Sequence, residues 1–125
     1  MAVSKHLDGD HIQYADRLVV RAQRCVELVA VEEILWAEAS GNYVRLHLGS
    51  DTLRVRSTFE SLLSRLDPDT FLRIHRSIVI NADHLRRVTA SNGSDAMVVL
   101  SDGTRLNLSR SHRADVDRYL ERLAG

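Results

Sequence analysis

The chain has 125 residues, a formal net charge of zero and 44% hydrophobic residues, values that are ordinary for one soluble globular domain. Its single cysteine, Cys25, excludes an internal disulfide framework and a zinc site built from several cysteines. Because Cys25 precedes the apolar run 26–31, we expect it to be a small buried thiol. No apolar run approaches the roughly 20 residues of a membrane span, and residues 1–16 lack the apolar core of a signal peptide. We therefore expect a cytoplasmic protein without membrane insertion.

The first half of the chain is dominated by strand patterns. Residues 1–16 show no hydrophobic period and are predicted to be a linker or disordered N-terminus, which precedes one domain at 17–125. Residues 43–48 alternate strictly between polar and apolar side chains, so His47 is expected to be solvated. Short runs of apolar and β-branched residues predict strands over 17–24, 26–31, 33–37, 43–48 and 53–56.

The hydrophobic period then changes from two to 3.6 residues. Ser57 and Glu60 have the spacing of a capping box, in which each side chain bonds a free amide of the first helical turn. Apolar residues follow on one helical stripe, and Asp67-Pro68 ends the pattern. The stripe consists of Phe59, Leu62, Leu63 and Leu66. A short amphipathic helix is predicted over about 57–66.

The second half of the chain returns to strands and ends in a helix. Asn92-Gly93 is a strong hairpin signal, because both residues tolerate positive φ. The C-terminal residues 111–123 predict a helix with Val116, Tyr119, Leu120 and Leu123 facing inward. Strands are predicted over 71–75, 78–80, 85–90, 96–100 and 104–108. The predicted fold is therefore mainly β, with one internal and one terminal helix.

Charge is distributed unevenly along the chain despite its zero total. Acidic residues outnumber basic ones in residues 1–40, whereas basic residues outnumber acidic ones in the stretch 71–113. The basic residues of that stretch are Arg73, Arg76, Arg86, Arg87, Arg105, Arg110 and Arg113, against Asp83, Asp95 and Asp102. An uneven distribution creates a local field that attracts a polyanion even when the net charge is zero.

The sequence gives no support for catalysis. Its six histidines lack the spacing of metal ligands, and its six glycines are scattered rather than gathered into a phosphate-binding loop. No pattern marks a serine nucleophile with its base and oxyanion hole. We therefore predict a protein that is not an enzyme and that has no cofactor and no bound metal.

Three polar clusters interrupt the apolar pattern at junctions between predicted elements. They are residues 39–43, residues 73–77 and residues 109–113. Each has an ordinary structural explanation: a turn, a strand edge kept soluble by charge, and a helix start capped by Ser109 or Ser111. Arginines are nevertheless unfavourable beside the positive end of a helix dipole, unless a phosphate approaches that end. Planar guanidiniums also suit phosphates and guanine edges.

Three segments around these clusters resemble one family in their order and spacing. They are ILWAEASGNYV at Ile34–Val44, FLRIHRSIVIN at Phe71–Asn81 and DGTRLNLSRS at Asp102–Ser111. They are similar to the LytTR DNA-binding domain of bacterial transcription and response regulators, and the resemblance covers about residues 17–123. It implies an elongated arrangement of short antiparallel sheets with a small internal helix. It also implies sequence-specific binding of double-stranded DNA by loops inserted into successive major grooves.

The resemblance also implies roles for individual residues. In the first loop the base-reading position falls on Asn42 or Tyr43, and in the second and third loops on Arg76 and Arg110. His75 is expected to pack or to brace its loop. The expected phosphate contacts are Ser77, Ser109 and Arg113, with Arg73 and Arg45 as further candidates.

Two further expectations concern partners. Sixteen leading residues are too few for the N-terminal receiver or sensor domain of many family members. We therefore expect either an output domain cut from a longer protein or a stand-alone member controlled by a separate regulatory protein. The resemblance implies paired direct repeats on DNA and a weak or DNA-dependent homodimer. The alternative function is a protein-interaction or dimerisation module of a signalling protein.

Overall fold

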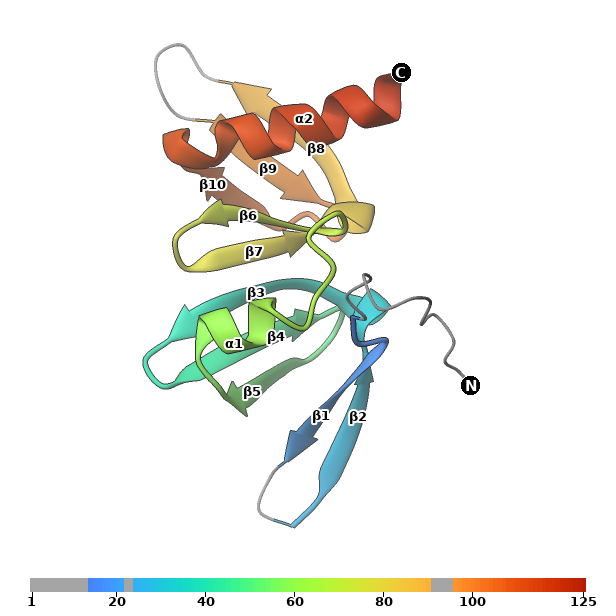
Figure 1. Ribbon diagram of the computed structural model, residues 1–125, viewed down its shortest axis with the longest axis vertical. Coiled ribbons are helices and arrows are strands. Elements are labelled where there is room, and N and C mark those ends of the chain that lie inside the picture. The colour runs from blue at the N-terminus through green and yellow to red at the C-terminus, as the bar shows by residue number, and fades with distance from the viewer. Residues whose placement is uncertain (1–13, 22–23, 91–95) are drawn as a thin grey trace, which may run out of the picture.

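The structure is a computed structural model that describes residues 14–21, 24–90 and 96–125. The described residues form an elongated molecule of short antiparallel sheets with two helices (Figure 1). The mainly β class predicted from the sequence is confirmed. Within those ranges no helix is long and apolar enough to cross a membrane.

The strands of the described chain form three separate antiparallel sheets. Their bounds are β1 (Arg17–Arg21), β2 (Val26–Ala30), β3 (Ile34–Ser40), β4 (Tyr43–Leu48), β5 (Thr52–Arg56), β6 (Phe71–His75), β7 (Ile78–Asn81), β8 (Leu85–Ala90), β9 (Ala96–Leu100) and β10 (Arg105–Leu108). The sheets are a ribbon of β1 and β2, a five-stranded sheet in the order β5-β4-β3-β7-β6, and a three-stranded sheet in the order β10-β9-β8. Because β7 pairs with β3, the hairpin β6–β7 extends the sheet that β3–β5 begin.

The helical elements connect and cover these sheets. They are α1 (Phe59–Leu63), α2 (Arg113–Ala124) and the short 3-10 turns η1 (Val31–Glu33), η2 (Ala82–His84) and η3 (Arg110–His112). The strand predicted over 33–37 begins at Ile34, because η1 occupies the residues before it. It continues to Ser40, three residues beyond the predicted end. The hairpin predicted at Asn92-Gly93 lies outside the described residues.

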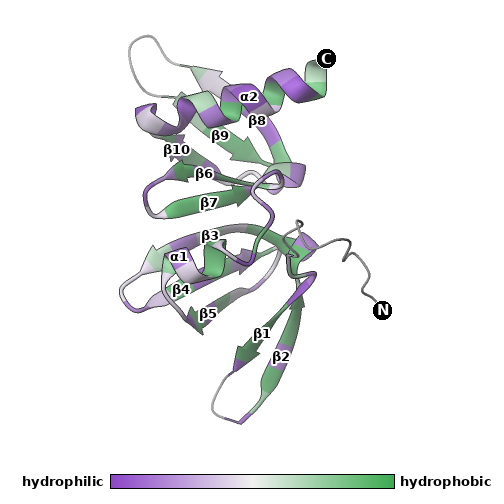
Figure 2. Cartoon of the chain, viewed as in Figure 1, coloured by the Kyte–Doolittle hydropathy of each residue, from purple (hydrophilic) through white to green (hydrophobic). Residues whose placement is uncertain are grey.

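Hairpin β6–β7 lies between two hydrophobic cores. Phe71 and Val79 face the first core, whereas Leu72 and Ile80 face the second. The first core comprises Leu18, Val20, Val29, Ile34, Ala37, Val44, Leu46, Phe59, Leu62, Leu66, Phe71 and Val79. The second comprises Leu35, Leu72, Ile74, Ile80, Ala82, Ala96, Val98, Leu100, Leu108 and Val116. Burial on both faces explains why residues 78–80 of β7 are continuously apolar rather than alternating (Figure 2). Strand β6 begins with the same two-sided burial at Phe71 and Leu72 but also carries the half-buried Arg73 and His75.

Helix α1 is shorter than predicted, and a different residue caps it. The Thr58 side chain accepts a hydrogen bond from the Ser61 amide at 3.1 Å, which makes Thr58 the N-cap. Ser57 instead donates to the Thr58 carbonyl at 2.9 Å, so the predicted capping box of Ser57 and Glu60 is wrong. The apolar stripe is confirmed in outline, although Leu63 is only partly buried.

Helix α2 covers the second core with its first half only. Val116 is fully buried and Tyr119 packs against the core. Leu120 and Leu123 are 36% and 68% exposed, which contradicts the inward orientation predicted for them. The spacing of apolar residues did not reveal where the underlying sheet ends.

Two single-residue predictions are also wrong. Cys25 is exposed, because it lies in the connection between β1 and β2, immediately before β2 begins. His47 is not freely solvated, since strand pairing sets it opposite Trp36. The two rings stack with centroids 3.8 Å apart, and the Glu38 carboxylate lies 2.7 Å from His47 Nε2.

Asn81 is a fully buried polar residue whose hydrogen bonds join two strands. Its side-chain amide donates to the Ile34 carbonyl at 2.9 Å, and its side-chain oxygen accepts from the Asp83 amide at 3.0 Å. Satisfying both ends of the amide offsets the cost of burying it. Asn81 thus ties β7 to the start of β3 and caps η2.

Candidate nucleic-acid interface

The three polar clusters lie along one long side of the molecule. The β3–β4 turn, the β6–β7 turn and the start of α2 follow one another along the left side of Figure 1. The first two are two-residue connections at the ends of hairpins. The third follows β10 and includes η3. Segments that are far apart in the sequence therefore share one edge.

Two backbone hydrogen bonds fasten the outer clusters to the middle one. The Ala39 amide, at the end of β3, donates to the Ser77 carbonyl at 2.9 Å. The Ser109 amide, after β10, donates to the Ile74 carbonyl at 2.8 Å. Main-chain bonds of this kind fix the spacing between the loops independently of their side chains. The clusters thus form one preorganised surface.

The first loop presents Asn42 at its tip. Gly41 has φ of 62°, a conformation that glycine adopts without steric cost. Asn42 is exposed in the turn, and Tyr43 pairs with Ser40 as the first residue of β4. The Arg54 guanidinium lies 4.2 Å from the centroid of the Tyr43 ring, so one face of that ring is covered by a cation.

The second loop consists of Arg76 and Ser77. Arg76 is exposed, whereas Ser77 is half-buried. The Ser77 amide donates to His75 Nδ1 at 3.2 Å, and the Ser77 hydroxyl lies 3.1 Å from the same nitrogen. The loop-bracing role expected for His75 agrees with these contacts.

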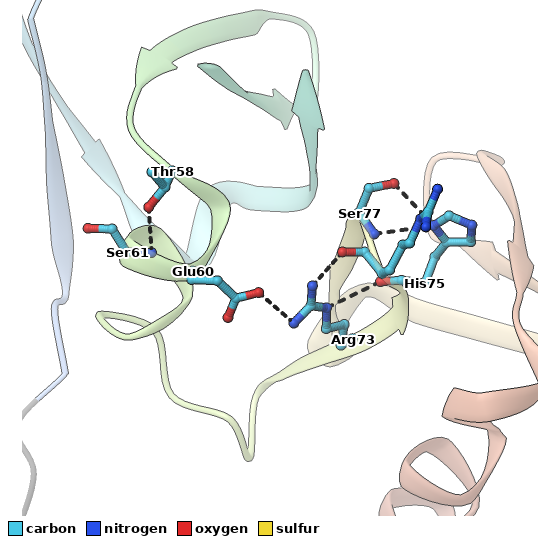
Figure 3. A network of polar contacts seen from close by, with 7 residues as sticks. Thr58, Glu60, Ser61, Arg73, His75 and Ser77 are labelled. Atoms are coloured by element: carbon cyan, nitrogen blue, oxygen red, sulfur yellow. Dashed lines mark hydrogen bonds and ion pairs between the residues drawn. The ribbon is translucent and has the colours of Figure 1, made fainter. Parts of the chain in front are cut away.

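Each of the three guanidinium nitrogens of Arg73 contacts a protein group. Its Nε donates to the His75 carbonyl at 3.3 Å, and Nη2 donates to the Arg76 carbonyl. Nη1 lies 3.0 Å from the Glu60 carboxylate on α1 (Figure 3). The group also lies over the Phe59 ring, 5.0 Å from its centroid. Arg73 therefore links α1 to the loop that presents Arg76.

The third loop precedes α2 and contains Ser109, Arg110 and Arg113. Arg110 is exposed, and Arg113 is half-buried at the first position of α2. The Ser109 hydroxyl lies 2.9 Å from His112 Nδ1. Within the described chain no side chain caps η3 or α2. Of the two serines offered as an ordinary explanation for this cluster, Ser109 is the N-cap residue of η3, but its hydroxyl makes no capping hydrogen bond. The amides of His112 and Arg113 instead donate to the carbonyls of Ser109 and Arg110.

A comparison of the sequence with models of protein families identifies the family. The family model described as the LytTr DNA-binding domain matches residues 24–121. The chain belongs to this family. The match contains all three loops of the candidate interface, and the fold predicted from the resemblance is the one observed.

Individual relatives agree with this family. An uncharacterised response regulatory protein of Vibrio cholerae is 37% identical over 90 residues, which are 69% of this chain and 34% of that protein. The transcriptional regulatory protein LytR of Staphylococcus aureus is 24% identical over 90 residues, 72% of this chain and 37% of that protein. A solved LytTr DNA-binding domain from Bacillus cereus matches with a TM-score of 0.75 at 18% identity, over 85% of this chain and 97% of that chain. The chain spans less than half the length of these curated relatives.

This LytTr domain has further basic residues that sequence reasoning missed. Arg54 and Arg56 are exposed on β5, and Arg56 pairs with Tyr43 beside the first loop. Arg45 lies on the same face, 42% exposed and 3.9 Å from the Glu38 carboxylate. The alternation of β5 did reveal a charged face, but only strand register shows that this face adjoins the first loop. Among the described residues, no group of three or more His, Cys, Asp or Glu side chains could hold a metal ion.

Proposed function

We propose that this LytTr domain binds double-stranded DNA sequence-specifically as the output domain of a bacterial transcriptional regulator. One observation supports this most strongly: two backbone hydrogen bonds hold three polar loops in a row on one side of the fold. Loops with fixed spacing can enter successive major grooves without a recognition helix. Direct reading of bases then depends on the side chains at the loop tips.

Base reading is assigned to Asn42, Arg76 and Arg110. All three side chains are exposed at the tips of their loops. Asn42 is favoured over Tyr43 because Arg54 covers the Tyr43 ring. Asn suits adenine N6 and N7, and Arg suits guanine O6 and N7.

Phosphate contacts are assigned to residues that flank those tips. Ser77 and Ser109 adjoin the base-reading arginines in sequence, and Arg113 lies three residues after Arg110. Arg45 extends the basic surface beside the first loop. The positive end of the α2 dipole lies beside Arg113 and favours an anion at the same place. Arg73 is assigned to support of the second loop, since its donors already bond protein acceptors.

The regulatory context is part of the same proposal. The curated relatives are longer, and two are named response regulatory and transcriptional regulatory proteins. We propose that this domain acts in the cytoplasm under a receiver or sensor domain, or under a separate regulatory protein. Its sites on DNA are proposed to be paired direct repeats.

The test is selection of bound duplexes from a random pool, followed by a salt titration on the best sequence. An enriched motif, together with a steep fall of log K against log salt, is expected for specific recognition with several phosphates engaged. Salt-sensitive binding without an enriched motif would show instead that a basic surface binds DNA without sequence specificity. Absence of binding by the folded protein would favour the alternative, an interaction module.

A further inference from the structure

The exposed large hydrophobic residues of the described chain gather in two patches. Val19, Val26 and Leu28 form the ribbon patch on β1–β2, and Leu120 and Leu123 form the helix patch on α2. The ribbon lies at one end of the long axis of the molecule and α2 at the other (Figure 1). Exposed apolar side chains that cluster, rather than scatter, mark interaction surfaces.

The ribbon patch is the outer face of a strand pair whose inner face is buried. Leu18, Val20 and Val29 pack into the first core. On the outer face Val19 pairs with Leu28, and Arg21 pairs with Val26. Val19 is 41% exposed, Val26 is 55% exposed and Leu28 is 58% exposed. The strands therefore carry hydrophobic residues on both faces. In Figure 2 most of β1 and β2 has the hydrophobic colour.

Positive charge borders the ribbon patch. Arg17 and Arg21 alternate with Val19 along β1, so they lie on the same face. Both are exposed, and neither forms an ion pair with another described residue. A partner surface that matches this patch has an apolar centre and carboxylates at its border.

The helix patch has that composition. Leu120 and Leu123 are one turn apart on α2, and Asp117, three residues before Leu120, lies beside them. Glu121 lies on the flank of the helix, four residues after Asp117. Both carboxylates are exposed, and neither has an ion-pair partner in the described part of the chain. Arg118 and Arg122 lie in the same turns, where they pair with Asp115 and Asp69. Among the described residues, the charges left unpaired in these turns are therefore the acidic ones.

We propose that the ribbon patch of one copy of this domain binds the helix patch of a second copy, head to tail. Apolar side chains meet apolar side chains, and the border arginines meet carboxylates. A symmetric contact of either patch with itself would bring like charges together, which disfavours it. The contact is therefore heterologous, and it does not close on a pair.

The placement of the two patches fits tandem binding to DNA. They lie at opposite ends of the long axis, whereas the three loops line one side of it. A second copy displaced along that axis keeps its loops on the same side. This step rests on the proposed function, while the contact itself does not.

The contact is expected to be weak without DNA. It offers three apolar residues on one side and two on the other, fewer than the roughly 20–30 residues a side of a standard interface. Two copies on one duplex have an effective concentration on the order of millimolar, at which a weak contact becomes populated. The patches thus favour cooperative binding over a stable dimer.

Mixing two variants tests the contact without DNA. Val19→Thr/Leu28→Thr removes the ribbon patch and Leu120→Gln/Leu123→Gln removes the helix patch, with residues suited to strand and helix. Sedimentation at protein concentrations up to about 1 mM is expected to show association of the unaltered chain beyond dimers. Each variant alone is expected to stay monomeric, and their equimolar mixture to form dimers only. Glu27→Gln, on the opposite face of β2 from Leu28, is the control and should associate normally.

Two solution outcomes would overturn the proposal. A mixture that stays monomeric while the unaltered chain stops at dimers would indicate a symmetric contact. An unaltered chain that is monomeric throughout would leave the patches to another domain or protein.

A second measurement separates this inference from the proposed function. On duplexes with two tandem copies of the selected site, either variant is expected to lose about tenfold in cooperativity and to keep full affinity for one site. Equal cooperativity of variants and unaltered chain would refute the role on DNA. Association in solution without sequence-specific binding would instead leave the contact standing and remove the proposed function.

Discussion

At the scale of residues, two arginines three positions apart differ in what they contact. Arg73 donates to the carbonyls of His75 and Arg76 and pairs with Glu60, whereas the Arg76 side chain is exposed. The first therefore shapes the loop and the second is free to bind. The difference follows from where the side chains lie. Arg73 reaches back to Glu60 of α1, whereas Arg76 lies beyond His75, the last paired residue of β6.

The base-reading arginines are expected to affect specificity. Arg76→Ala or Arg110→Ala should cost about 1–3 kcal/mol on the selected sequence and relax preference at a few base pairs. Arg113→Ala should weaken all sequences alike and reduce the salt slope by about one. Binding titrations on selected and random duplexes measure both effects.

Arg122 provides a control for those substitutions. It lies in the last turn of α2, at the other end of that helix from Arg110, and Asp69 is 3.5 Å away. Arg122→Ala should leave binding unchanged. Equal losses on selected and random DNA for Arg76, Arg110 and Arg113 would refute the division into base and phosphate contacts.

Arg73 is expected to act through the loop it supports. Arg73→Gln removes charged hydrogen bonds worth roughly 1.5–3 kcal/mol each, so affinity for the selected sequence should fall. The slope of log K against log salt should stay the same, because no phosphate contact is lost. A slope reduced by about one would show instead that Arg73 contacts a phosphate directly.

At the scale of elements, α1 depends on its surroundings. A helix of five residues is too short to be stable alone, so its cap and its buried side chains hold it in place. Phe59 and Leu62 insert into the first core, and Glu60 reaches Arg73. The position of α1 therefore affects the position of the second loop, because Glu60 pairs with Arg73 and Arg73 bonds the loop.

The identity of the cap is expected to appear in stability. Thr58→Ala should lower the free energy of unfolding by about 1 kcal/mol, because the Ser61 amide loses its acceptor. Ser57→Ala, the neighbouring substitution, should change it by less than about 0.5 kcal/mol. Chemical denaturation of both variants measures the difference. A larger loss for Ser57→Ala would restore the capping box that the sequence pattern favours.

At the scale of the whole molecule, β6 and β7 join the two cores. Their residues alternate between the first core and the second, and Asn81 bonds β7 to β3. Neither core can lose its packing without disturbing these two strands. The strands that present Arg76 are thus held by both cores.

We expect one cooperative unfolding transition for both cores. Leu62→Ala in the first core and Val116→Ala in the second should each cost on the order of 2–5 kcal/mol and shift the same transition. Far-UV circular dichroism and Trp36 fluorescence should give coincident curves. Two separated transitions, each moved by only one substitution, would show that the cores unfold independently.

The sequence by itself determined the strands of β3–β10 to within a few residues, because period and turn residues are local properties. It also determined which loops hold the polar clusters, and the resemblance carried by three short segments determined the family. The predicted ends of elements were wrong where tertiary packing decides them. Thr58 rather than Ser57 caps α1, and the end of α2 extends past the second core.

Only the tertiary structure decided which residues meet. Strand order places β7 beside β3, register stacks His47 on Trp36, and two main-chain bonds bring the loops together. It also revealed that the outer face of β1–β2 and the end of α2 stay uncovered. Contacts between residues distant in sequence depend on pairing and packing of whole elements, which no local pattern encodes.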